Sequence, residues 1–150
     1  MEDQVPADVV KERYNRLLAL QSRIAEEENV ARVGHEVEVL VSSGEGRKDT
    51  QTHRVSGRAA DNRLVHVALP EALAESERPR PGDMVRAVVT HGAPHHLVAD
   101  SAAIGGVFEI RRTRAGDAWE ARERRTAQLR AEAEGKLPVS IGLPKLRVGA

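Results

Sequence analysis

The spacing of apolar residues changes at Gly34, and this change limits the folds that the chain can adopt. Between Asp8 and Arg32, large apolar residues recur at helical spacing, which predicts a long amphipathic helix. Its apolar stripe consists of Val10, Tyr14, Leu17, Leu18 and Ile24. From His35 onward, apolar and polar residues alternate, as they do in strands that are buried on one face only. We therefore expect a long N-terminal helix followed by a mainly β domain.

Five short segments after Gly34 have the alternation and the β-branched residues that are typical of strands. They are residues 35–41, 53–59, 64–69, 84–90 and 96–100. Because no helical segments alternate with them, the pattern favours a small five-stranded antiparallel barrel, OB-like or SH3-like. An open sheet of three or four strands is the alternative. The segments between the strands, including 91–95, are rich in Gly, Pro and polar residues and are interpreted as loops and turns.

The C-terminal third of the chain is basic and poor in apolar residues. Residues 102–150 carry 10 basic and 6 acidic side chains. Residues 117–134 are strong helix formers, but their only large apolar residues are Trp119 and Leu129, so we expect a marginal, exposed helix. We therefore divide the chain into an N-terminal helix (1–33), a barrel (34–101) and a basic, partly disordered tail (102–150).

The composition excludes several kinds of site. The chain has no cysteine, which rules out disulfides, thiolate zinc sites, iron–sulfur ligation and cysteine nucleophiles. It has no apolar run close to the ~20 residues that cross a bilayer, and its acidic start differs from a signal peptide. We therefore expect a cytoplasmic protein with no membrane partner. Arginine supplies 19 of the 23 basic residues, which permits binding to nucleic acid but is also a habit of GC-rich genomes.

Three candidate reaction sites are weak. The loop residues 44–48 resemble a phosphate loop but lack its GK[ST] ending, and the serines lack a GxSxG context, so hydrolysis is not expected. His91, His95, His96 and Asp100 include the ligand types that zinc accepts. In a strand, however, adjacent histidines point to opposite faces. Their better use is as hydrogen-bond donors to RNA phosphates or base edges.

The most informative cluster is basic. The strand before the turn Ala60-Asp61-Asn62 and the strand after it bring Arg54, Arg58, Arg63 and His66 near one edge of the predicted barrel. A ridge of Arg and His on a small barrel is typical of an RNA-binding surface. A solvated charged face is the alternative interpretation.

Four segments, taken in order, resemble a known family. They are VPADVVKERYNRLLALQSRIAEEEN, VGHEVEVLV, SGRAADNRLVHV and PGDMVRAVVTHGAPHHLVAD. Together they resemble the C-terminal part of tRNA methylthiotransferases of the MiaB type, and RRTRAGDAWEA with the late GLP resembles the tails of actinobacterial members. The resemblance implies that residues 33–100 form a TRAM domain, a small β-barrel that binds tRNA. It also implies that residues 8–32 form the helix leading into this domain from the catalytic barrel.

The resemblance sets expectations about chemistry. The family makes 2-methylthio-N6-dimethylallyladenosine with S-adenosylmethionine and two 4Fe-4S clusters, each held by a cysteine triad. Since the chain has no cysteine, it is expected to hold neither cluster and not to catalyse the reaction alone. Its expected role is to grip the tRNA anticodon arm, so that the adenosine next to the anticodon reaches a catalytic centre elsewhere. The candidate RNA-binding residues are Arg47, Lys48, Arg54, Arg58, Asn62, Arg63, His66, His95 and His96.

A protein-interaction module is the competing interpretation. In that case the apolar stripe of the N-terminal helix docks on a separate radical S-adenosylmethionine catalytic chain. The two interpretations differ in whether the barrel covers the stripe or leaves it exposed, because a large exposed apolar patch indicates a partner.

Overall fold

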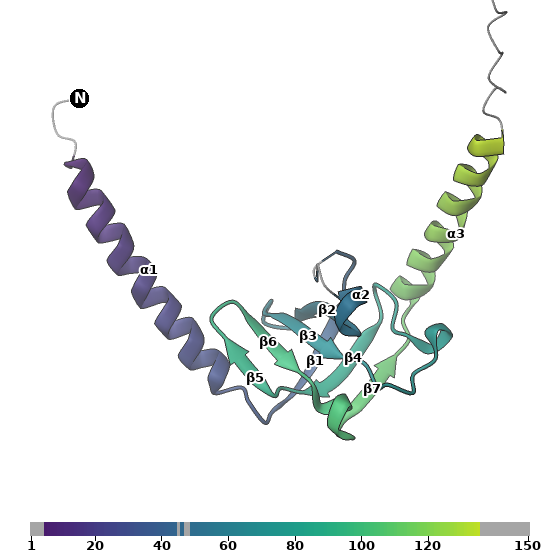
Figure 1. Cartoon of the computed structure of the whole chain (residues 1–150), viewed down its shortest axis with the longest axis horizontal. Coiled ribbons are helices and arrows are strands. Elements are labelled where there is room, and N and C mark those ends of the chain that lie inside the picture. The colour runs from purple at the N-terminus through teal and green to yellow at the C-terminus, as the bar shows by residue number, and fades with distance from the viewer. Residues whose placement is uncertain (1–4, 45, 47–48, 136–150) are drawn as a thin grey trace, which may run out of the picture.

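The computed structural model describes residues 5–44, 46 and 49–135, and consists of a curved sheet with a long helix projecting from each end (Figure 1). The long helices are α1 (Ala7–Val30) and α3 (Arg114–Gly135). The strands are β1 (Glu36–Val41), β2 (Arg54–Ala59), β3 (Leu64–Ala68), β4 (Met84–Val88), β5 (His91–Ala93), β6 (His96–Ala99) and β7 (Phe108–Arg111). The short elements are α2 (Asp49–Thr52) and two 3₁₀ turns, Glu75–Glu77 and Ser101–Ile104. The long N-terminal helix and the mainly β region are confirmed.

The strands form one seven-stranded sheet in the order β5-β6-β3-β2-β1-β4-β7. The neighbours β3 and β6 are parallel, with Val65 opposite Leu97, and every other pair is antiparallel. The predicted five-stranded antiparallel barrel is therefore wrong in strand number and in this pair. An OB-like closure is not confirmed either, because within the described residues the outer strands β5 and β7 are not paired with each other.

Two strands were not predicted, because each is too short to show a clear alternation. β5 has three residues and lies in the segment that was interpreted as a loop. β7 has four residues and follows the pair Gly105-Gly106, which is typical of a loop. Since β7 pairs with β4, the sheet continues beyond residue 101.

The core lies on one face of the sheet, and its residues alternate with exposed ones as the sequence predicts. The buried cluster consists of Val39, Val41, Val65, Val67, Val85, Ala87, Val89, Leu97 and Ala99. Phe108 and Ile110 on β7 pack against this cluster and are partly buried. Within the described residues both long helices point away from the sheet (Figure 1), so the core side chains are buried against one another and the sheet must curl around them.

A glycine allows two central strands to approach closely. A Cβ atom at Gly57 on β2 would lie 2.0 Å from the carbonyl oxygen of Leu40 on β1. Any side chain at this position would push the two strands apart, so the close pairing of β1 and β2 depends on Gly57.

Within the described residues, helix α1 contacts the sheet near its C-terminal end. The Asn29 side-chain Nδ2 donates a hydrogen bond to the Ala93 carbonyl over 2.6 Å, and Asn29 is 5% exposed. A Cβ at Gly92 would lie 2.4 Å from the Asn29 backbone, so the helix rests directly on the backbone of β5. Ion pairs Arg63–Glu28 (2.9 Å) and Arg32–Asp61 (3.1 Å) join the end of α1 to the turn between β2 and β3. The N-terminal part of α1 therefore projects as an arm.

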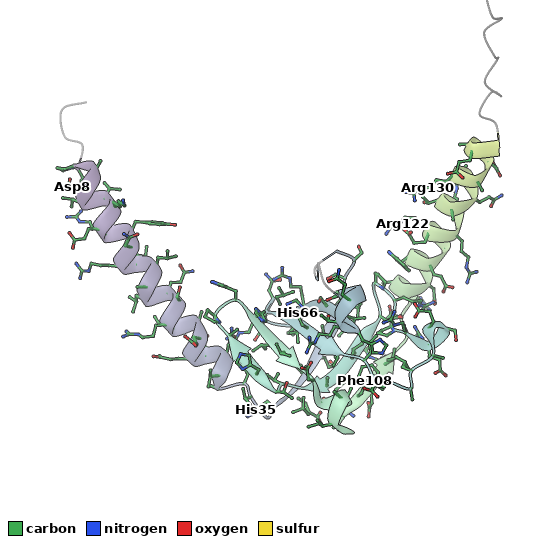
Figure 2. The ribbon with its side chains drawn as sticks, viewed as in Figure 1. Asp8, His35, His66, Phe108, Arg122 and Arg130 are labelled. Atoms are coloured by element: carbon green, nitrogen blue, oxygen red, sulfur yellow. The ribbon has the colours of Figure 1, made fainter. Side chains whose placement is uncertain are left out.

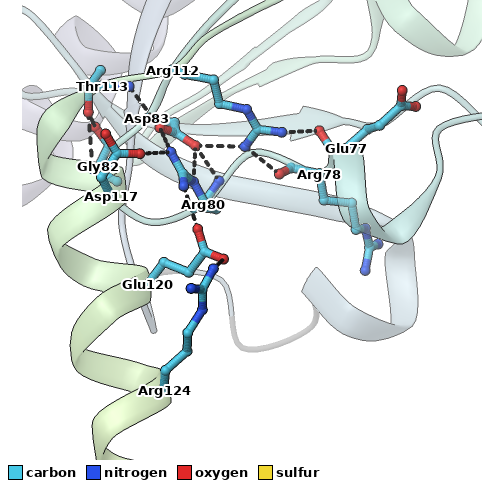
Figure 3. A network of polar contacts seen from close by, with 11 residues as sticks. Glu77, Arg78, Arg80, Gly82, Asp83, Arg112, Thr113, Asp117, Glu120 and Arg124 are labelled. Atoms are coloured by element: carbon cyan, nitrogen blue, oxygen red, sulfur yellow. Dashed lines mark hydrogen bonds and ion pairs between the residues drawn. The ribbon is translucent and has the colours of Figure 1, made fainter.

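Helix α3 is attached through the buried carboxylate of Asp83, which is 0% exposed (Figure 3). Its Oδ2 accepts hydrogen bonds from Arg80 Nε at 3.0 Å and from Arg112 Nη1 at 2.9 Å. Its Oδ1 accepts from the Thr113 backbone N–H at 3.0 Å, directly before α3 begins. Arg80 continues into the helix with ion pairs to Asp117 (2.9 Å) and Glu120 (2.5 Å). We call Asp83, Arg80, Arg112 and Thr113 the Asp83 clamp.

Helix α3 begins three residues before the predicted start at Asp117. Thr113 Oγ1 accepts a hydrogen bond from the Gly116 N–H at 3.1 Å, so Thr113 caps the first turn. Asp117, where the helix was predicted to begin, pairs with Arg80. Neither α1 nor α3 has the length of apolar sequence that is needed to cross a bilayer.

Replacing Asp83 with Asn is expected to lower the free energy of unfolding by roughly 2–3 kcal/mol, because the guanidinium groups of Arg80 and Arg112 lose their shared buried anion. Burial alone would raise the pKa of Asp83, but hydrogen bonds from Arg80, Thr113 and Arg112 hold it well below its usual value. The stabilisation is therefore present above the unfolded pKa near 4 and is lost as the pH falls towards the depressed folded value. Urea denaturation at pH 7 measures the effect.

The matched control for this variant is Glu109→Gln, which removes an exposed carboxylate from an ion pair with Arg86. We expect a cost of less than about 0.5 kcal/mol there. Equal stability losses in the two variants would contradict a special role of the Asp83 clamp.

Candidate nucleic-acid interface

Two turns and the end of α1 enclose a groove of about 230 Å³ at one corner of the sheet. The turns are the one between β2 and β3 and the one between β5 and β6. The lining residues are Ala25, Glu28, Asn29, Arg58, Asn62, Arg63, Leu64, Pro94, His95 and His96. We call this the corner groove. Five of the nine candidate RNA-binding residues lie in it: Arg58, Asn62, Arg63, His95 and His96.

The shape of the β2–β3 turn explains why Asn62 and Arg63 reach the groove. Asn62 has a φ of 65°, a left-handed conformation that Asn tolerates better than most residues. Asp61 Oδ1 accepts a hydrogen bond from the Arg63 N–H at 3.3 Å, as in an Asx turn. The ADN sequence that predicted a turn therefore also positions the next basic side chain.

The two arginines of the corner groove are held differently. Arg63 forms ion pairs with Asp61 at 3.0 Å and with Glu28 at 2.9 Å, so carboxylates already balance its charge. Arg58 Nη1 donates to the backbone carbonyl of Asn62 at 3.2 Å, which fixes the guanidinium at the mouth of the turn. Both arginines therefore place a guanidinium group at the corner groove.

Arg54 lies outside the corner groove. Its Nε and Nη2 donate to the two Asp100 oxygens over 3.2 and 2.5 Å, a bidentate pair. The hydrogen bond to Asp100 raises the pKa of Arg54, although burial opposes this. Asp100, considered above as a metal ligand, thus serves as an arginine partner, and the described residues contain no group of three side chains suited to a metal ion.

His66 is in contact with His96, which lines the corner groove. Their rings meet edge to face, with centroids 5.0 Å apart. His66 Nδ1 lies 2.6 Å from the Ser56 Oγ, and Ser56 Oγ donates to Asp49 Oδ1 at 2.8 Å. Because the Ser56 hydroxyl has a single proton, which it gives to Asp49, His66 Nδ1 acts as the donor to Ser56. Figure 2 shows His66 in the middle of the sheet, close to α2.

Sequence reasoning missed the contribution of Ser56 and Asp49. Ser56 is 1% exposed and buried beneath α2, so it is a link between α2 and β3 and not a nucleophile. The register could have revealed the link, because Ser56 and His66 lie directly opposite across the predicted β2–β3 hairpin.

The opposite part of the sheet surface is electrically balanced. Arg86 on β4 pairs with Glu36 on β1 at 2.9 Å and with Glu109 on β7 at 2.6 Å. Arg111 on β7 lies 3.8 Å from Glu38 on β1. The arginines of these three strands are therefore paired with carboxylates on another of the three, and we call these ion pairs the balanced ladder.

The remaining candidates, Arg47 and Lys48, lie outside the described residues. Residues 136–150 of the tail that was expected to be partly disordered lie outside them as well.

Comparison with known proteins identifies close relatives, although no family model matches the chain. The tRNA-2-methylthio-N(6)-dimethylallyladenosine synthase of Kineococcus radiotolerans is 57% identical over 147 residues, which are 98% of this chain and 27% of the relative. The enzyme of the same name from Clavibacter sepedonicus is 58% identical over 99% of this chain and 28% of its own length. The one from Thermobifida fusca is 57% identical over 97% of this chain and 26% of its own length. The chain thus spans about a quarter of the length of these relatives.

The lowered pKa of His96 predicts that the stability of the protein depends on pH. Burial lowers the pKa of His96, and the neighbouring His66, His91 and His95 lower it further. The folded protein therefore binds fewer protons at this site than the unfolded chain, so stability is full above the unfolded pKa of 6.5 and declines as the pH falls through the folded value. Between pH 7.5 and pH 5, the free energy of unfolding should fall less in a His96→Gln variant than in the wild type. Urea titrations of both proteins at both pH values measure this difference, and parallel declines would contradict the assignment.

Proposed function

The chain corresponds over almost its whole length to the C-terminal part of MiaB-type tRNA methylthiotransferases, and on this basis we propose that it is a tRNA-binding module of the TRAM type. Its ligand is the anticodon arm, which it holds so that an adenosine beside the anticodon reaches a catalytic centre outside this chain. Since the chain has no cysteine, we assign the iron–sulfur clusters and the S-adenosylmethionine chemistry to the part of the relatives that it does not cover.

The observation that carries the proposal is the convergence of predicted RNA-binding residues on the corner groove. Arg58, Asn62 and Arg63 come from one turn, whereas His95 and His96 come from another that is about 30 residues later in the sequence. A guanidinium contacts phosphate, and amide and imidazole groups bond to sugar or base edges. The groove therefore combines groups that hold an RNA backbone with groups that recognise an exposed nucleotide.

The direct test is fluorescence anisotropy of a labelled anticodon stem-loop, with a scrambled hairpin beside it, over a range of salt concentrations. We expect tighter binding to the anticodon stem-loop and a linear decrease of log K with log salt, because phosphate contacts release counterions. Replacing Arg58 with Ala should weaken binding and reduce the salt slope by roughly one unit.

Arg86→Ala serves as the control, because Arg86 lies in the balanced ladder on the other part of the sheet and should leave the slope unchanged. Absence of binding by the wild-type chain at low salt would contradict the proposed function. An unchanged slope in Arg58→Ala would remove Arg58 from the interface.

Exposure of the α1 stripe supports a second role, docking on a catalytic partner. Tyr14 and Leu17 are each 62% exposed, Val10 is 52% exposed, and Leu18 and Ile24 are 47% and 45% exposed. The described part of the sheet does not cover this stripe, and apolar surface of this extent on a helix is typical of an interface. The partner that we propose is the cysteine-bearing catalytic part of a MiaB-type enzyme.

This role predicts association in solution with the catalytic part of a relative that is produced without its C-terminal quarter. Leu17→Glu should weaken the association at least about tenfold, because it places a charge in the apolar contact. Leu129→Glu, on the exposed surface of α3, is the matched control and should have little effect. Titration calorimetry measures both, and equal binding of the two variants would exclude the stripe as the docking surface.

A further inference from the structure

Three polar side chains of the corner groove make no hydrogen bond within the part of the chain that the structure describes. They are the Asn62 amide and the imidazoles of His95 and His96. Other polar side chains in the groove have partners: Asn29 donates to Ala93, and Glu28 accepts from Arg63. The polar side chains that α1 contributes to the groove therefore have hydrogen-bond partners within the protein. Those of Asn62, His95 and His96, on the two turns, can form hydrogen bonds with a ligand.

The size of the corner groove limits what can enter. The groove has a volume of about 230 Å³ and is bounded by two tight turns and the end of a helix, so it has no room for an RNA duplex. A paired helix presents its phosphates but keeps its bases stacked inside, so only an unpaired nucleotide can place its base among these side chains.

The chemistry of the available groups suits a base better than a second phosphate. Burial and the neighbouring histidines lower the pKa of His96, which favours its neutral form with one donor and one acceptor nitrogen. The Asn62 amide also offers both a donor and an acceptor. The exposed His95 ring provides a flat surface on which a base can stack.

We propose that the corner groove receives one unpaired nucleotide of the bound RNA, with its base against Asn62, His95 and His96 and its phosphate at Arg58. This inference rests on the proposed RNA-binding function and adds to it a defined subsite for a nucleotide that has left the stack. Recognition of the RNA then depends on a loop or bulge, and not on the duplex stem alone.

The test compares three RNAs with the full chain: the anticodon stem-loop, a fully paired duplex of the same length, and the stem-loop with 2-aminopurine at successive loop positions. The variant is Asn62→Gly combined with His95→Ala. Glycine keeps the positive φ of residue 62 while removing the amide. His35→Ala, at an exposed histidine outside the groove, is the matched control.

We expect the double variant to bind the stem-loop about tenfold more weakly than the wild type, because stacking and base contacts are lost. Its salt slope and its affinity for the duplex should be unchanged, because the phosphate contacts remain. One loop position should change its 2-aminopurine fluorescence on binding to the wild type and to His35→Ala, but not to the double variant.

Two results would overturn the inference in distinguishable ways. If the wild type binds stem-loop and duplex equally and the double variant matches it, the nucleotide subsite is wrong while RNA binding stands. If the wild type binds none of these RNAs at low salt, both the subsite and the proposed function are wrong.

Discussion

The buried carboxylate of Asp83 joins the segment before β4 to the segment that leads from β7 into α3. Asp83 accepts hydrogen bonds from Arg80, which precedes β4, and from Arg112 and Thr113, which lead from β7 into α3. A carboxylate without these donors would be costly to bury, and the arginines without the carboxylate would repel each other. Because the carboxylate and the two arginines stabilise one another, they fix the point at which α3 leaves the sheet. The direction of α3 thus depends on the Asp83 clamp together with the ion pairs of Arg80 to Asp117 and Glu120.

The other arm, α1, is attached by close backbone contact together with two ion pairs at its C-terminal end. Gly92 lets β5 touch the last turn of α1, and Asn29 locks that contact with a buried hydrogen bond. The same contact forms one wall of the corner groove, since Asn29 lines it together with the two turns. The contact that attaches α1 to the sheet therefore also shapes the candidate RNA site. The part of α1 that projects from the sheet carries the exposed apolar stripe.

The elements with strong local signals could be predicted, and those determined by distant contacts could not. The helical stripe of α1 and the alternation of β1 to β4 and β6 locate these elements to within a few residues. The three-residue strand β5 is stabilised by its neighbours, β6 and the end of α1. The sequence of β5 itself does not reveal either contact. In the candidate site, the ADN turn correctly brought Arg58 and Arg63 together, but the partner of Arg54 is Asp100, 46 residues away, which no local pattern reveals.

The central claim is that RNA binds at the corner groove, and chemical-shift mapping tests it most directly. Backbone amide resonances of the ¹⁵N-labelled chain are recorded with and without an anticodon stem-loop. The account predicts that the largest shifts cluster at residues 58–63 and 94–96, with little change in β4 and β7. Shifts confined to the balanced ladder of β1, β4 and β7, or to the apolar stripe of α1, would contradict it.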